Sequence, residues 1–120
     1  MNSQPDIRVR IGDLTVIRFQ SRKILDAGLI DERNEEINSD PPKDDPSTIF
    51  NFSEVQFISS GVLNKLIVLE KTISELNGRL ILCGLTEPLR DLFSMTRLDQ
   101  VFTIVENEAD AVEQFSQDKD

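Results

Sequence analysis

The 120-residue chain contains no histidine, no tryptophan, no tyrosine and only one cysteine. Without histidine it cannot form a Ser-His-acid triad or a Cys-His dyad, and it lacks the commonest zinc ligand and general base. A single cysteine excludes an intramolecular disulfide and a multi-cysteine metal site. We therefore expect a protein that is not an enzyme and that carries no metal or other cofactor.

Two glycine-rich phosphate-binding motifs, G-x-G-x-x-G and G-x-x-x-x-G-K-[ST], are also missing. No apolar run approaches the ~18 residues of a membrane-spanning helix. The first residues, Met-Asn-Ser-Gln-Pro, lack the basic and apolar segments of a signal peptide. The sequence therefore predicts a cytoplasmic protein without membrane insertion.

Positive charge is scarce, because 13 basic residues stand against 22 acidic ones and give a net charge of −9. Binding to nucleic acid or to an anionic membrane surface requires a basic face, so neither is an expected partner. The negative charge favours solubility, and it would also suit a basic protein partner.

The most informative stretch is residues 48–76, which predicts a strand, a turn and a helix. The strand is short and apolar around Phe50, and an apolar stripe at spacings of three and four then marks one helix face. Gly78 is expected to end this helix. The stripe consists of Val62, Leu66, Leu69, Ile73 and Leu76.

The junction between this strand and helix is Ser59-Ser60-Gly61. Either serine can cap the helix, since its hydroxyl can accept a hydrogen bond from an unpaired amide of the first turn. Alternatively, one hydroxyl is exposed at the positive end of the helix, where an added phosphate would be tolerated. The pattern alone leaves both interpretations open.

The remaining elements predict one α/β domain, with a mixed sheet of four to five strands and helices packed against it. Its core would span about residues 6–115, with a surface loop at 39–47 and a frayed tail at 116–120. The charged run 31–36 is expected to be a solvated helix face, with Arg8, Arg10 and Arg18 also facing water. The other predicted elements are a hairpin over 7–19, helices over 27–38, 88–96 (capped by Thr86) and 108–115, and strands over 79–83 and 102–105.

Several segments carry a resemblance to the STAS domain of anti-sigma factor antagonists, over about residues 6–115. The most specific part is the apolar-Ser-Ser-small pattern at the strand-helix junction, combined with the downstream Leu-Cys strand. The segments are 50–63 (FNFSEVQFISSGVL), 78–85 (GRLILCGL), 88–93 (PLRDLF), 98–102 (LDQVF) and 107–111 (NEADA).

This resemblance implies an anti-sigma factor antagonist that binds an anti-sigma factor with serine kinase activity and so releases a sigma factor. It also implies that the kinase phosphorylates Ser60 and that a serine phosphatase reverses the modification. Asp26 matches an acidic residue that the family places near the acceptor. The implied partner-binding residues are Asp26, Ser59, Ser60, Gly61 and Val62.

Two other functions stay open at this point. The chain could be a non-phosphorylated STAS scaffold of the stressosome type or a subunit of a lipid-transport ATPase complex, and its oligomeric state is undetermined. An enzyme acting through Ser59 or Ser60 is disfavoured, because the sequence offers no base to activate the hydroxyl.

Overall fold

The computed structural model describes residues 6–39 and 45–118. Strands and helices alternate along most of the chain, as the sequence predicted. The elements are β1 (Ile7–Ile11), β2 (Leu14–Arg18), β3 (Lys23–Ile24), α1 (Gly28–Asn38), β4 (Thr48–Asn51), β5 (Phe57–Ile58), α2 (Ser60–Glu75), β6 (Leu80–Cys83), α3 (Glu87–Met95), a 3₁₀ turn η1 (Leu98–Gln100), β7 (Thr103–Val105) and α4 (Glu108–Asp118).

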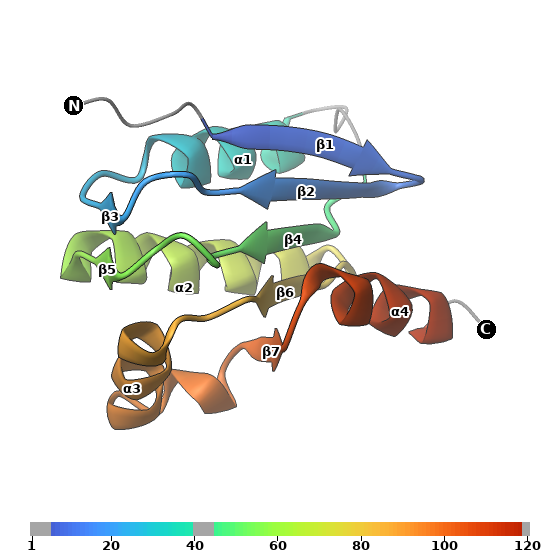
Figure 1. Cartoon of the computed structure of the whole chain (residues 1–120). Helices are drawn as coiled ribbons and strands as arrows, with labels where there is room; N and C mark the ends of the chain where they lie inside the picture. The colour runs from blue at the N-terminus through green and yellow to red at the C-terminus, as the bar shows by residue number, and fades with distance from the viewer. Residues whose placement is uncertain (1–5, 40–44, 119–120) are drawn as a thin grey trace.

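Five strands form one mixed sheet in the order β1-β2-β4-β6-β7, which confirms the predicted fold class (Figure 1). Strand β1 runs antiparallel to β2, and the other neighbours are parallel. A second, two-stranded parallel sheet of β3 and β5 was not predicted. It lies at the end of the molecule where α2 begins.

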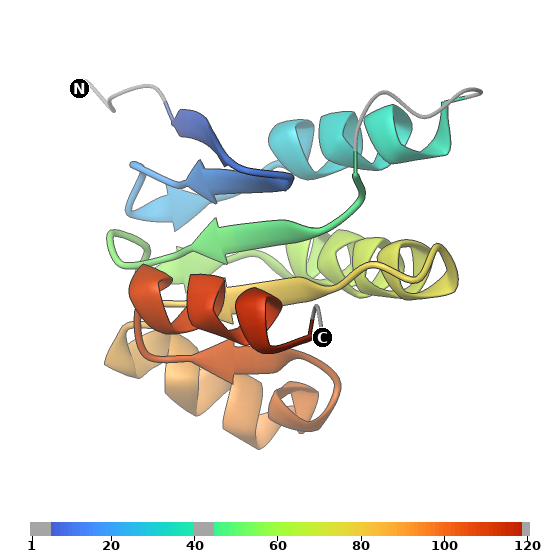
Figure 2. The same ribbon diagram turned by 90° about the vertical axis from the view of Figure 1, so that its right-hand side faces the viewer.

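Helices cover both faces of the sheet. Figures 1 and 2 show α1 and α2 on one face and α4 on the other. The larger apolar cluster lies under α1, α2 and α3 and includes the packed rings of Phe19, Phe50 and Phe52. The smaller cluster lies under α4 and is built around Ile49 and Ile81. Because β4 and β6 are buried from both sides, Ile49-Phe50 in β4 and all four residues of β6 are apolar without alternation.

The predicted hairpin is confirmed, and Gly12 forms its turn with a φ of 60°. Helix α2 is also confirmed, but Gly78 does not supply the left-handed residue that ends it. Asn77 does, with a φ of 65°. Gly78 is needed for a different reason, because an added Cβ would lie 2.9 Å from Pro46. Pro46 packs closely against the chain just after α2, so position 78 requires a residue without a side chain.

Three smaller predictions are corrected or fall outside the described residues. Thr86 is the N-cap residue of α3, as predicted, but its side chain makes no capping bond, and its hydroxyl instead donates to the Val55 carbonyl at 2.6 Å. Helix α4 continues to Asp118, so residues 116–118 are helical where a frayed tail was expected. Most of the predicted 39–47 loop, residues 40–44, and the tail residues 119–120 lie outside the described residues.

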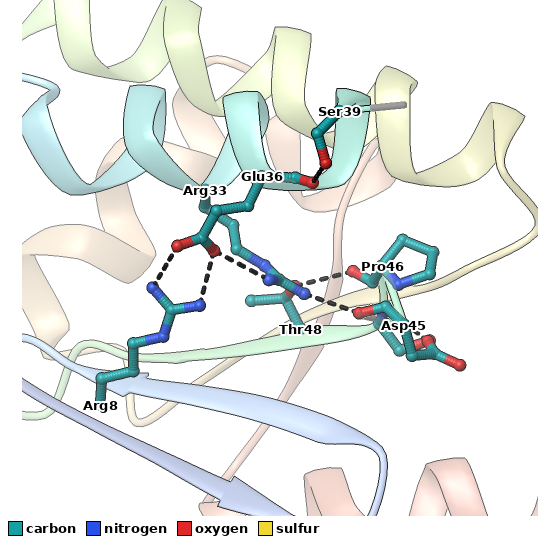
Figure 3. Close-up of polar contacts among 8 residues, drawn as sticks. Arg8, Arg33, Glu36, Ser39, Asp45, Pro46 and Thr48 are labelled. Carbon is teal, nitrogen blue, oxygen red and sulfur yellow. Dashed lines mark hydrogen bonds and ion pairs between the residues drawn. The ribbon is translucent and has the colours of Figure 1, made fainter. Parts of the chain in front are cut away.

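The prediction that residues 31–36 form a solvated helix face is wrong at Arg33, which is 0% exposed. Its guanidinium donates to the Thr48 hydroxyl at 3.0 Å, to Glu36 at 3.1 Å and to the Asp45 carbonyl at 2.8 Å (Figure 3). Arg8 of β1 holds Glu36 from the other side through both guanidinium NH₂ groups. Arg33 therefore joins α1 to the start of β4, and Glu36 extends the network to β1.

This network predicts a loss of stability in acid. Hydrogen bonds from Arg8 lower the pKa of Glu36, and those from Arg33 add to the effect. A lowered folded-state pKa means that the unfolded chain binds more protons as the pH falls below about 4.5. The stabilisation from Glu36 is therefore complete above that pH, and it disappears as the pH falls through the folded-state pKa.

We expect Glu36→Gln to lower the free energy of unfolding by about 1 kcal/mol at pH 7. The difference from wild type should shrink in urea titrations repeated at successively lower pH. Glu32→Gln on the same helix is the matched control, since Glu32 is exposed and makes no ion pair among the described residues. If the difference in unfolding free energy between wild type and Glu36→Gln were the same at pH 7 and pH 3, the ionised Glu36 carboxylate would not be the source of the stabilisation.

Candidate functional site

The Ser59-Ser60 junction lies where the small β3-β5 sheet meets the start of α2. The Ser59 amide donates to the Ile24 carbonyl at 3.0 Å, which continues the β3-β5 ladder by one residue. The Ser59 carbonyl then accepts the first helical bond, from Leu63 at 3.0 Å. The helix start is thus fixed by hydrogen bonds to the preceding sheet and to its own first turn.

The structure distinguishes the two serines. Ser59 is the N-cap of α2, and its hydroxyl accepts a hydrogen bond from the Val62 amide at 3.2 Å. Ser60 is the first helical residue and is exposed. Its hydroxyl makes no hydrogen bond to any residue that the structure describes. Capping therefore occupies Ser59 and leaves the Ser60 hydroxyl accessible at the positive end of the helix.

The other predicted site residues are only partly brought together at the surface. Gly61 is exposed beside Ser60, with open space where a Cβ would stand. The Val62 side chain is 2% exposed and belongs to the core. Val62 therefore serves the site through its amide, and its side chain is not on the surface.

Asp26 reaches the same end of the molecule through strand pairing. Ile24 and Ile58 are the last pair of the parallel β3-β5 sheet. Asp26 lies two positions after Ile24, and Ser60 lies two positions after Ile58. Asp26 is exposed, and its carboxylate accepts a hydrogen bond from the Gly28 amide at 3.0 Å. This contact holds the carboxylate at the start of α1.

Two exposed apolar side chains at this end were not predicted as site residues. Leu25 is 64% exposed and Phe57 is 48% exposed. Their neighbours Ile24 and Ile58 are buried, so strand alternation turns Leu25 and Phe57 outward. The sequence carries no clear signal for them, because β3 and β5 have only two residues each and are too short to show an alternating pattern. Exposed apolar groups beside polar ones are typical of protein interfaces.

A second polar cluster lies at the same sheet edge, on the α4 face. Arg18, which was expected to face water, donates to both carboxylate oxygens of Glu108 at 2.7 and 3.0 Å. The Asn51 amide donates to the same carboxylate at 2.7 Å. The hydrogen bonds from Arg18 are the main reason that the pKa of Glu108 is lowered. Because these groups satisfy one another, the cluster ties β2 and β4 to the start of α4.

Cys83 lies close to this cluster but has no reactive thiol. Burial raises the pKa of Cys83 to about 12, and the Glu108 charge adds to the shift. The thiolate is the nucleophilic and metal-binding form, so a thiol with this pKa stays inert near neutral pH. Among residues 6–39 and 45–118, no group of three or more acidic, cysteine or histidine side chains is placed to hold a metal ion. No helix in these ranges is long and apolar enough to cross a membrane.

Comparison with known families identifies the fold. The STAS domain family matches residues 4–111, so the chain belongs to the STAS domain family. A search of curated proteins gives no match.

Solved structures of the same fold cover nearly the whole chain. An anti-sigma-factor antagonist (STAS) domain protein from Planctomyces limnophilus is 16% identical with a TM-score of 0.77, over 92% of this chain and 97% of the other. An anti-sigma factor antagonist from Mycobacterium paratuberculosis is 19% identical with a TM-score of 0.72, over 92% of each chain. Bacillus SpoIIAA in its phosphorylated form is 16% identical with a TM-score of 0.66, over 92% of this chain and 99% of the other. These likenesses confirm the predicted STAS fold.

Proposed function

We propose that this STAS domain is an anti-sigma factor antagonist switched by reversible phosphorylation at Ser60. It binds an anti-sigma factor that is also a serine kinase, and this binding releases a sigma factor. The kinase phosphorylates Ser60, and a serine phosphatase removes the phosphate. The observation that carries the proposal is the division of roles at the helix start, where Ser59 caps α2 and Ser60 presents an exposed hydroxyl.

The physical basis of the switch is local charge. A phosphate adds about −1.5 to −2 charge at pH 7. At the first position of α2 it lies near unpaired amides and the positive end of the helix, so the fold tolerates it. A partner that covers Ser60 and the apolar side chains of Leu25 and Phe57 would instead have to desolvate a dianion, which is costly without a paired cation. Phosphorylation would therefore abolish binding while leaving the domain folded.

Similar proteins of known structure support the proposal. Structures of the anti-sigma factor antagonist SpoIIAA describe an unphosphorylated form and a phosphorylated form. The likeness to this chain at 16% identity concerns the fold, so the role is carried over as part of the proposal.

The test is intact-mass analysis of the protein from its own cells, followed by peptide mapping across Ser59 and Ser60. We expect a fraction of the molecules to carry one phosphate, located on Ser60. Incubation with a purified candidate kinase and ATP should modify wild type and Ser59→Ala but leave Ser60→Ala unmodified. Absence of phosphate in cells under several growth conditions and after kinase treatment would overturn the switch and favour a constitutive scaffold or complex subunit.

A further inference from the structure

A cavity lies between α3 and β7, away from the Ser59-Ser60 junction. It has a volume of about 400 Å³, which is within the range of about 300–1,000 Å³ found for ligand pockets. Its apolar lining comes from Leu85, Phe93, Ile104 and Val105. None of these residues took part in the site described above.

Charged side chains lie around this apolar lining. Asp99 and Glu106 line the cavity and are exposed, and neither carboxylate has a hydrogen bond or an ion pair among the described residues. Arg90 is the one cation in the lining, and its Nε donates to the Leu85 carbonyl at 3.2 Å. The three charges sum to −1, so the cavity favours an occupant that combines an apolar part with a positive charge.

The cavity adjoins an open sheet edge. Strand β7 is the last strand in the sheet order, so one of its sides pairs with β6 and the other has no partner strand among the described residues. Extended peptides bind such edges by adding a strand. In an added strand, alternate side chains would lie on the same sheet face as Ile104, next to the cavity.

We propose that this cavity and the edge of β7 together bind an extended, basic segment of a protein partner. The segment pairs with β7 and inserts one arginine or lysine side chain into the cavity. The aliphatic stem packs on the partly exposed Ile104, and the cationic head meets Asp99 and Glu106. The overall charge of −9 favours approach of a basic segment. The site is separate from the Ser60 switch and does not depend on it.

The test is a titration of the ¹⁵N-labelled domain with a capped pentapeptide that has one central arginine between valine and threonine residues. Amide shifts should concentrate on residues 103–106 and Leu85, and at least one β7 amide should become protected from hydrogen exchange. The same peptide with citrulline in place of arginine should bind at least about fivefold more weakly, the effect of losing roughly 1 kcal/mol of ion-pair energy.

Matched variants separate a local site from general charge attraction. Asp99→Asn combined with Glu106→Gln should weaken peptide binding at least about fivefold. Asp110→Asn combined with Glu113→Gln removes the same charge from exposed positions on α4 and should leave binding within about twofold of wild type. Equal weakening by both pairs, shifts scattered over the acidic surface, or no shifts at millimolar peptide would overturn the proposal. Equal binding of N-acetylarginine amide without β7 protection would overturn strand addition.

Discussion

Replacing Arg33 by alanine is expected to lower the free energy of unfolding by about 3 kcal/mol. Arg33 is fully buried and donates to the Thr48 hydroxyl, the Glu36 carboxylate and the Asp45 carbonyl. Alanine removes these bonds and leaves a space between α1 and β4. The buried Thr48 hydroxyl would lose its donor, although it keeps its own bond to the Pro46 carbonyl at 2.8 Å.

Two further variants separate the causes of this loss. Arg33→Met keeps an unbranched apolar stem but no donors, so it should recover the part of the stability that comes from packing. Arg22→Ala, at an exposed position, is the control and should change the unfolding free energy by less than about 0.5 kcal/mol. Urea titration at pH 7 measures all three. A loss in Arg33→Ala no larger than in Arg22→Ala would show that the buried network does not stabilise the fold.

Arg33 also shows why a charged run can be misinterpreted. Composition alone suggested a solvated face, yet Arg33 lies three residues after Ile30 and four before Ile37, and both isoleucines are 1% exposed. Helical spacing therefore places Arg33 on the buried face. Its hydrogen-bonding partners on β4 and in the preceding loop are distant in sequence, so no local pattern could name them.

The parts of the fold that depend on periodicity were predicted well. The hairpin, the strand at β4, the long helix α2 and the apolar strand β6 each carry a pattern of several residues, and all are present. The β3-β5 sheet was missed because each strand has two residues, too few to show alternation. The left-handed residue after α2 is Asn77, and the prediction of Gly78 overlooked that asparagine also tolerates that conformation.

The strand-helix junction that carries the candidate site was predicted, but the separate roles of its two serines were not. Sequence identified residues 59–61 as the junction, but either serine could have been the cap. Hydrogen-bond geometry decides this, since the Val62 amide meets the Ser59 hydroxyl. The exposure of Leu25 and Phe57 depends on the β3-β5 pairing, which the sequence did not predict.

The second large effect is expected at Ser60, in binding to the anti-sigma factor kinase of the proposed function. Ser60→Asp should weaken binding at least about 30-fold, corresponding to roughly 2 kcal/mol, because the partner must desolvate a carboxylate. Ser60→Ala removes a small hydroxyl and should leave the dissociation constant within about threefold, the equivalent of about 0.6 kcal/mol. Titration calorimetry or surface plasmon resonance with the purified kinase measures both constants.

A matched control places the same charge elsewhere on α2. Ser74 is exposed near the other end of this helix, about 20 Å along the axis at about 1.5 Å per residue. Ser74→Asp changes the net charge equally, so it should leave binding near the wild-type value if the effect at Ser60 is local. Equal weakening by both acidic variants would instead indicate general charge repulsion.

Stability measurements on the same variants separate switching from unfolding. An aspartate at the first position of α2 interacts favourably with the positive helix end, by about 0.3–1 kcal/mol. Ser60→Asp should therefore unfold at the same urea concentration as wild type or at a higher one, so a loss of binding could not be attributed to a loss of fold. If the acidic variant binds as tightly as wild type, charge at this position does not control the interaction. The exposed Leu25 and Phe57 side chains would then favour a constitutive assembly surface.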